Sequence, residues 1–286
     1  MNRNSLIQHI KEKESYLCVG LDSDIVKIPQ HLQNHTDAVF EFNKQIIDAT
    51  LDLCVGYKIN TAFYEVRGAK GWEDMQRTVE YIPDTHFKIA DAKRGDIGNT
   101  SSHYAKTFFD TVPFDAITVA PYMGSDSVKP FLDYENKWTI VLGLTSNPGA
   151  ADFELQQLLH EQSDQLRQPG EDIQRRYLYE KVIEEVATWG TKENLMFVVG
   201  ATKADQVASV RKIVPDHFLL IPGVGFQGGS LSEVSKYGLT DDCGLLVNVS
   251  RAIIYAGSGE NFAKEARAIS LQYQTEMKMY LDHYKG

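Results

Sequence analysis

Four charged side chains follow one short apolar segment and could carry out acid–base chemistry together. The segment covers residues 87–90, and it is followed by Asp91, Lys93, Arg94 and Asp96. Asp91 and Lys93 are two residues apart, so on an extended strand they point to the same side. Carboxylates on both sides of an ammonium group, at the end of a hydrophobic strand, are costly unless they are paired or used. This run is therefore the first candidate for a reactive site.

A cluster of solvated surface ion pairs would explain the same charges. Two features favour a reactive site. The segment is apolar right up to Asp91, and small polar residues at 99–102 lead from the charges into a helical pattern that begins at His103. A strand that ends in charged residues and runs into a helix is where α/β enzymes place their chemistry.

Composition narrows the class of protein. The chain has 286 residues, of which 43% are hydrophobic and 24% charged, as is ordinary for a globular protein. A formal net charge of −10 argues against a nucleic-acid partner, although a local basic cluster could still bind a small anion. The three cysteines and eight histidines show no metal-ligand spacing, and the scattered cysteines favour a reducing, cytoplasmic setting. The first residues do not resemble a signal peptide and no apolar run reaches ~18 residues, so we expect no membrane partner.

Eight short apolar runs alternate with helical patterns along the chain. Continuous apolar runs of this kind are typical of parallel strands covered by helices. The length suits an α/β protein formed by a single (β/α)8, or TIM, barrel, for which about 250 residues is typical. An open, doubly wound sheet is the competing fold, but it would more often follow its first strand with a G-x-G-x-x-G turn, and this chain does not. The expected strands cover residues 16–21, 55–60, 87–90, 115–120, 139–144, 195–200, 217–221 and 244–249.

Two further segments accompany the regular alternation. A short helix over residues 6–13 is expected before the first strand. The connection between the fifth and sixth strands, residues 151–194, is unusually long and carries helical patterns at 153–159 and 177–186. Its apolar content looks too small for a core of its own, so we interpret it as a helical insertion above the barrel mouth. The chain is then expected to form one domain over residues 1–286.

The carboxyl ends of the expected strands bring more charge to the same place. In such a barrel the active site lies at these ends. Asp22 follows the first strand, Lys58 lies near the end of the second, and Ser146 follows the fifth. Lysines and aspartates that alternate around one cavity would keep each other ionised by proximity.

The ends of the last two strands suit an anion. A glycine-rich loop over residues 222–229 would let backbone N–H groups approach an anion closely, and Ser250 and Arg251 follow the neighbouring strand. Arginine offers forked donors, and the loops after strands seven and eight are a frequent phosphate site in these barrels. A plain flexible turn would explain the glycines by themselves, but the arginine beside them favours phosphate binding.

These residues resemble a known family. The run Asp91-x-Lys93-x-x-Asp96-Ile97-x-x-Thr100 resembles the signature of the orotidine 5′-phosphate decarboxylases, and the likeness extends over nearly the whole chain. The longer, type 2 form of the family is the closer match, through residues 57–65 and 91–96. Residues 146–149 resemble the pyrimidine-contacting loop of the family, and residues 222–229 resemble its phosphate loop.

The resemblance implies a reaction. Orotidine 5′-phosphate would lose CO2 from C6 and become UMP, the last step of de novo UMP synthesis, without a metal or an organic cofactor. Lys93 would stabilise the developing carbanion and deliver a proton to C6, with Asp91 beside the departing carboxylate. Lys58 and Asp96 would complete the catalytic set. A homodimer is also implied, in which each site takes Asp96 and Thr100 from the partner chain.

The resemblance also implies how the substrate is held. Asp22, Lys58 and Thr100 would bind ribose hydroxyls, and Ser146 would contact the pyrimidine. Gln227 and Arg251 would bind the phosphate. The other substrate-binding residues implied are Ile97, Pro222, Gly228, Gly229 and Ser250.

Two alternatives remain open on the sequence. A metal-dependent sugar-phosphate decarboxylase or aldolase of the same barrel group would share the D-x-K strand, but it would place an acidic residue where this chain has Lys58. A nucleotide-phosphate-binding barrel without catalytic activity is the other alternative. Binding alone would not need the buried charges of Asp91, Lys93 and Asp96 together.

Overall fold

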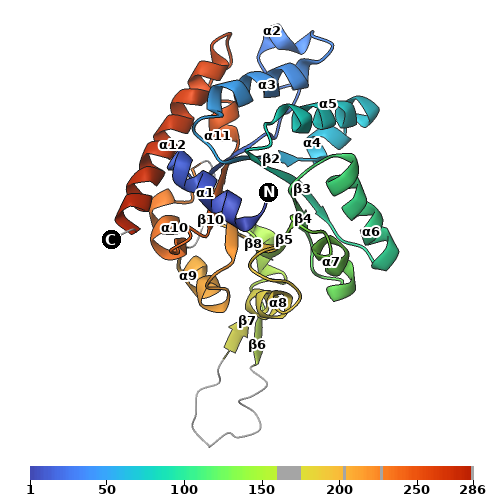
Figure 1. Cartoon of the computed structure of the whole chain (residues 1–286), viewed down its shortest axis with the longest axis vertical. Coiled ribbons are helices and arrows are strands. Elements are labelled where there is room, and N and C mark those ends of the chain that lie inside the picture. The colour runs from blue at the N-terminus through green and yellow to red at the C-terminus, as the bar shows by residue number, and fades with distance from the viewer. Residues whose placement is uncertain (160–174, 202–203, 226–227, 285–286) are drawn as a thin grey trace, which may run out of the picture.

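The structure, a computed structural model, describes residues 1–159, 175–201, 204–225 and 228–284. Eight parallel strands close into a barrel in the order β1-β10-β9-β8-β5-β4-β3-β2, and helices surround it (Figure 1). The TIM-barrel prediction is therefore confirmed. The barrel strands are β1 (Leu17–Gly20), β2 (Gly56–Asn60), β3 (Phe87–Arg94), β4 (Ala116–Val119), β5 (Trp138–Leu144), β8 (Leu195–Val199), β9 (Phe218–Pro222) and β10 (Leu245–Val249).

Burial explains why the apolar runs form these strands. Every residue of β1, β4, β8 and β10 is buried, because side chains on one face fill the barrel and those on the other pack under the helices. The covering helices present apolar faces to the strands, as α3 does with Val39, Phe42 and Ile46. The helices are α1 (Arg3–Lys13), α2 (Gln30–Gln33), α3 (Ala38–Thr50), α4 (Ala62–Glu65), α5 (Gly68–Tyr81), α6 (Gly98–Lys106), α7 (Ser125–Leu132), α8 (Leu178–Ala187), α9 (Ala204–Ile213), α10 (Leu231–Gly238), α11 (Arg251–Ile254) and α12 (Phe262–Tyr284).

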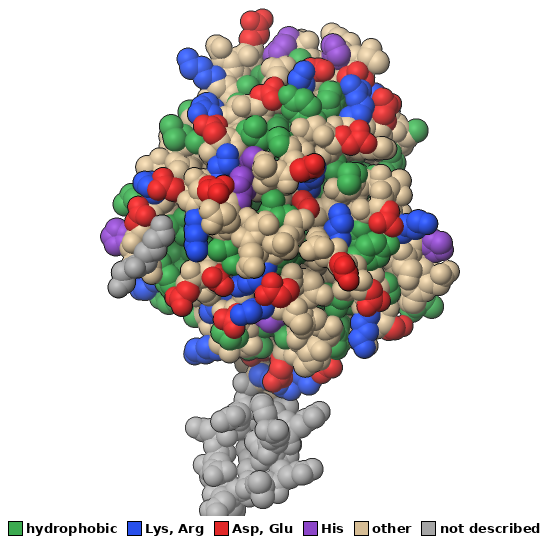
Figure 2. All heavy atoms as spheres, viewed as in Figure 1, with side chains coloured by type: hydrophobic (Ala, Val, Ile, Leu, Met, Phe, Trp, Pro, Cys, Tyr) green, Lys and Arg blue, Asp and Glu red, His purple; other side chains and the backbone are tan. Residues whose placement is uncertain are grey.

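Helix α1 lies across the amino-terminal end of the barrel, in front in Figure 1. It begins at Arg3, earlier than expected, because the Asn2 side chain caps it by accepting a hydrogen bond from the Ser5 N–H at 2.9 Å. Arg3 is buried and forms an ion pair with Asp242 at 3.1 Å. Acidic and basic side chains are interspersed over this face of the molecule (Figure 2). No helix in the described part of the chain has the length and apolar character of a membrane span.

The prediction of a helical insertion between the fifth and sixth barrel strands is wrong in part. Residues 153–159 contain a turn and the strand β6 (Gln157–Leu159), which pairs antiparallel with β7 (Arg175–Tyr177) and extends away from the barrel (Figure 1). The backbone of β6 finds its partners far along the chain, and local apolar spacing does not reveal such pairing. The expected helix at 177–186 is present as α8, which packs through Ile183 and Val186 as the crossover from β5 to β8.

A buried histidine makes the stability of this fold depend on pH. His86 is 2% exposed, and its Nε2 lies 2.8 Å from the Leu51 carbonyl oxygen. Burial lowers the pKa of His86 to about 4, so the folded protein keeps the ring neutral at pH 5. The unfolded chain would bind a proton there below about pH 6.5. The contribution of the neutral His86 ring to the free energy of unfolding is fully present above about pH 6.5, and it is lost as the pH falls toward 4.

We expect His86→Gln to weaken this pH dependence, since the amide can still donate to the Leu51 carbonyl but does not titrate. The measurement is the free energy of unfolding by denaturant at pH 7 and at pH 5. The stability lost between these pH values should be about 2 kcal/mol smaller in the variant than in the wild type. His103→Gln, at an exposed position of α6, is the control and should behave like wild type. An unchanged pH dependence in His86→Gln would contradict the assignment.

Candidate active site

The carboxyl ends of β1, β2, β3, β9 and β10 surround a cavity of about 190 Å³. Asp22, Lys58 and Asp91 line one part of it, and Pro222 and Arg251 line another. The barrel thus brings residues that are far apart in the sequence to one opening, as expected for the carboxyl ends of parallel strands. Acidic and basic groups lie within reach of one small ligand.

Asp91 lies between two ammonium groups. Lys58 Nζ donates to Asp91 Oδ2 at 2.7 Å, and Lys93 Nζ donates to Asp91 Oδ1 at 2.5 Å. The Lys58 side chain is 5% exposed and that of Asp91 12%, whereas that of Lys93 is 50% exposed. Both oxygens of Asp91 are therefore paired, and Lys93 is the more solvent-exposed of its two ammonium partners.

The cluster stays charged despite its burial. Burial by itself would raise the pKa of Asp91, but Lys58 and Lys93 outweigh it and hold that pKa well below its usual range. Burial likewise opposes the charge on Lys58, but Asp91 and Asp22 raise its pKa above the ordinary lysine value. Opposite charges at this distance stabilise each other strongly where water is largely excluded. The site is thus a fixed array of alternating charge at neutral pH.

Asp22 belongs to the same array at longer range. Its Oδ1 lies 3.7 Å from Lys58 Nζ, which is an ion pair but too long for a hydrogen bond. That oxygen is buried and accepts no hydrogen bond from the described residues. Because Asp22 lines the cavity, an acceptor of this kind suits a ligand hydroxyl.

Strand β3 continues through the charged run, beyond the expected end at residue 90. Its pairing with β4 shifts between Ala90 and Arg94, which is a bulge in the ladder. Lys93 within the bulge has φ of +47°, in the left-handed region that side-chain-bearing residues rarely adopt. Such backbone strain is often found where a structure must aim a functional side chain.

Asp96, Ile97 and Thr100 do not join this cluster within one chain. The Asp96 carboxylate accepts a hydrogen bond from the Ile97 N–H at 2.7 Å, and no ion pair within the described residues links it to Lys58 or Lys93. Ile97 is 60% exposed, and Thr100 is exposed on the first turn of α6. The predicted catalytic set is therefore only partly assembled in a single chain.

The loop after β9 has backbone geometry that requires glycine. Gly223, Gly225 and Gly228 have φ of +96°, +79° and +86°. A Cβ atom at Gly229 would lie 2.6 Å from the Ala201 Cβ, so no side chain fits there. The predicted Gln227 lies outside the described residues.

The end of β10 provides the neighbouring half of the expected anion site. Arg251 is exposed at the start of α11 and lines the same cavity as Lys58 and Asp91. Ser250 has a structural contact as well, since its hydroxyl donates to the Gly20 carbonyl at 3.0 Å and joins β10 to β1. The loop, Ser250 and Arg251 therefore meet at one side of the cavity.

Ser146 lies elsewhere on the barrel rim. It follows β5, which is opposite β1 in the barrel, and it is not among the residues that line this cavity. A Cβ atom at Gly200, after β8, would lie 2.9 Å from the Ser146 Cβ, so Ser146 packs closely over that glycine.

Sequence reasoning missed two polar residues in this region. Thr118, on β4, is 1% exposed and donates to Asp91 Oδ1 at 3.1 Å. Asn248, on β10, is 7% exposed and lines the cavity, and its Oδ1 has no hydrogen-bond partner among the described residues. The signal for both was a single polar residue inside an otherwise apolar strand, which costs stability unless it has a partner.

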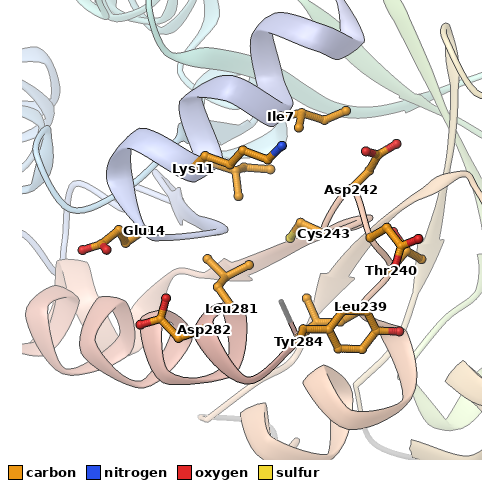
Figure 3. Close-up of a pocket in the computed structure, with 12 residues that line it drawn as sticks. Ile7, Lys11, Glu14, Leu239, Thr240, Asp242, Cys243, Leu281, Asp282 and Tyr284 are labelled. Atoms are coloured by element: carbon orange, nitrogen blue, oxygen red, sulfur yellow. The ribbon is translucent and has the colours of Figure 1, made fainter. Parts of the chain in front are cut away.

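A second cavity, of about 230 Å³, lies at the amino-terminal end of the barrel (Figure 3). Lys11, Asp242, Cys243 and Leu281 are among the residues that line it, between α1, α12 and the turn that precedes β10. Asp242 is already paired with Arg3. None of the predicted site residues lies there, so the charged cavity at the carboxyl ends is the candidate active site.

A closed (β/α)8 barrel with charged residues and a glycine-rich loop at its carboxyl ends defines a barrel enzyme for small anionic substrates. The sequence profile of the "Orotidine 5'-phosphate decarboxylase / HUMPS family" matches residues 15–266. The chain belongs to this family, and the resemblance is confirmed.

Individual relatives match nearly the full length of the chain. The chain is 56% identical over 285 residues to the orotidine 5′-phosphate decarboxylase of Flavobacterium johnsoniae, covering 99% of each. It is 53% identical over 280 residues to that of Bacteroides fragilis, covering 97% of each. The fold matches a putative orotidine-monophosphate decarboxylase structure from Toxoplasma gondii with a TM-score of 0.82 and 34% identity, over 98% of this chain and 97% of that one. The OMP decarboxylase structure from Leishmania donovani matches with a TM-score of 0.75 and 34% identity, over 96% and 99%.

Proposed function

We propose that this protein decarboxylates orotidine 5′-phosphate to UMP and CO2. The main support is the charged array in which Asp91 is held ionised between Lys58 and Lys93. The chain that contains this array belongs to the decarboxylase family. Lys58 at the end of β2 also favours this reaction over the metal-dependent alternative, because an ammonium group occupies the place where that chemistry would need an acidic ligand.

In the proposed reaction the bond between C6 and the carboxylate carbon breaks, and its electron pair stays on C6. CO2 leaves, and Lys93 Nζ donates a proton to C6; solvent then reprotonates the lysine. The partly exposed position of Lys93 supports this role, because the ammonium group can reach both a ligand and water. Asp91 would lie beside the substrate carboxylate.

Repulsion between Asp91 and the carboxylate is too small to explain catalysis alone. Two like charges ~4 Å apart repel by about 4 kcal/mol at a moderate effective dielectric. A slow reaction of this class needs on the order of 20 kcal/mol of barrier reduction. The fixed charges of Lys58, Asp91, Lys93 and Asp96, together with binding energy from the distant phosphate, would supply most of it.

The remaining substrate contacts are proposals as well. Asp22, Lys58 and Thr100 would bind the ribose, and the Asp22 oxygen that accepts no hydrogen bond from the described residues supports this. Ser146 would contact the pyrimidine. The phosphate would bind Gln227 and Arg251. The other proposed substrate-binding residues are Ile97, Pro222, Gly228, Gly229 and Ser250.

We further infer a single-domain cytoplasmic enzyme that acts as a homodimer, with Asp96 and Thr100 completing the partner's site. Two observations support the dimer. Asp96 has no ion pair with the charged cluster of its own chain within the described residues. Large apolar side chains are exposed after β2, β3 and β4: Val66 at 82%, Ile97 at 60% and Tyr122 at 90%. Large apolar side chains that are this exposed, and that follow the carboxyl ends of neighbouring barrel strands, favour a contact between two copies of the chain.

Shared sites predict complementation between two inactive variants. Lys93→Ala and Asp96→Ala should each have little activity alone. Refolding an equal mixture should restore about a quarter of wild-type activity, because half of the dimers are mixed and one of their two sites is intact. If Asp96 acts within its own chain, no site in a mixed dimer is intact, and activity would not return.

The function itself is tested by the ultraviolet absorbance of orotidine 5′-phosphate with purified protein, with and without EDTA. Loss of the orotate band that EDTA does not change is the expected result. Loss only without EDTA would indicate a metal-assisted reaction. A folded protein that binds UMP tightly but leaves the band unchanged would be a binding barrel without activity.

A further inference from the structure

Thr118 lies opposite the bulge in β3. Ala90 pairs with Ile117 and Arg94 pairs with Val119, so residues 91–93 of β3 all face the single residue Thr118 on β4. A bulge leaves backbone groups of the longer strand without partners in the ladder. Thr118 is 1% exposed, so its hydroxyl must find its own partners inside the protein.

The hydroxyl of Thr118 forms hydrogen bonds with both Lys93 and Asp91. It accepts a hydrogen bond from the Lys93 backbone N–H at 2.9 Å. It donates to Asp91 Oδ1 at 3.1 Å, the same oxygen that accepts from Lys93 Nζ. One side chain therefore holds the left-handed backbone from which Lys93 projects and the carboxylate toward which its ammonium group points.

We propose that Thr118 is a positioning residue for the decarboxylation, acting through Asp91 and Lys93; this inference rests on the proposed function. Without the hydroxyl, the Lys93 N–H would lose its partner, and the strained bulge could relax toward regular pairing with β4. The direction of the Lys93 side chain depends on that bulge, because a shift of register turns side chains to the other face. Small displacements of a catalytic group of about 1 Å can lower the rate about 10²-fold.

Thr118→Val tests this, because valine keeps the shape and removes the hydroxyl. Measured well below the melting temperature of the variant, kcat should fall about 30- to 100-fold while KM changes less than about 3-fold. Thr118→Ser should recover kcat to within about 3-fold of wild type, since it keeps the hydroxyl.

The matched control is Thr139→Val on the adjacent strand β5. Thr139 is equally buried, but its Oγ1 has no hydrogen-bond partner among the described residues. The same substitution there should leave kcat unchanged. If Thr118→Val does not accumulate as folded protein, Thr118→Cys replaces it, because a thiol fills the site but is a weak donor and acceptor.

The outcomes separate this inference from the proposed function. A wild-type protein that does not turn over orotidine 5′-phosphate would refute the function. If wild type is active, three results would overturn the role of Thr118. These are a kcat within 3-fold of wild type in the hydroxyl-free variant, an equal loss in Thr139→Val, or a change in KM alone. A merely structural threonine would lower the melting temperature and leave kcat per folded molecule intact.

Discussion

Lys93→Ala should lower kcat by at least about 10⁴-fold and leave the protein folded. In the proposed mechanism, the substitution removes both the cation that would stabilise the C6 carbanion and the proton that would quench it, and each effect is typically worth 10²-fold or more. The fold should tolerate the change because the Lys93 side chain is 50% exposed and Lys58 still pairs with Asp91. The measurement is turnover of orotidine 5′-phosphate, with circular dichroism and the melting temperature to establish that the variant is folded.

Lys106→Ala supplies the control, since it removes an exposed lysine from α6 on the same connection. It should retain wild-type kcat. A folded Lys93→Ala protein with near-normal kcat would remove Lys93 from the chemistry, even if the wild type proves to be a decarboxylase.

The barrel could be predicted from sequence because its signal is local. The barrel strands contain short apolar runs without a period of two, which is typical of parallel strands that are buried on both faces. The connection after β5 could not be predicted in the same way. Residues 157–159 form a strand only because β7 supplies antiparallel partners, and the spacing of apolar residues there also fits a helix.

The charged cluster was predictable in composition but not in geometry. The spacing of Asp91 and Lys93 indicated that they share a side, and their contact confirms it. The bulge that sets the direction of Lys93 depends on register with β4, which the sequence of β3 does not contain. Thr118 was missed for the same reason, since its role depends on which residue of β4 faces the bulge.

The charged cluster and the proposed phosphate site line different parts of one cavity, and this arrangement has an energetic consequence. The substrate phosphate is remote from the bond that breaks. Its binding energy can therefore increase the rate of decarboxylation only by holding the pyrimidine against the fixed charges of the cluster. A substitution at the phosphate end should then reduce the rate of chemistry as well as the affinity. The same substitution should have almost no effect on a substrate that lacks the phosphate.

Arg251→Ala tests that coupling directly. With orotidine 5′-phosphate, kcat/KM should fall about 10²- to 10³-fold, the expected cost of losing a forked, charge-assisted contact to a dianion. With orotidine, kcat/KM should change less than about 2-fold, because that substrate has no phosphate for the arginine to recognise. Arg267→Ala is the matched control: that arginine pairs with Asp52 on the outer surface at 2.6 Å and should affect neither substrate. Equal losses on both substrates would show that Arg251 supports the structure of the site and does not recognise phosphate.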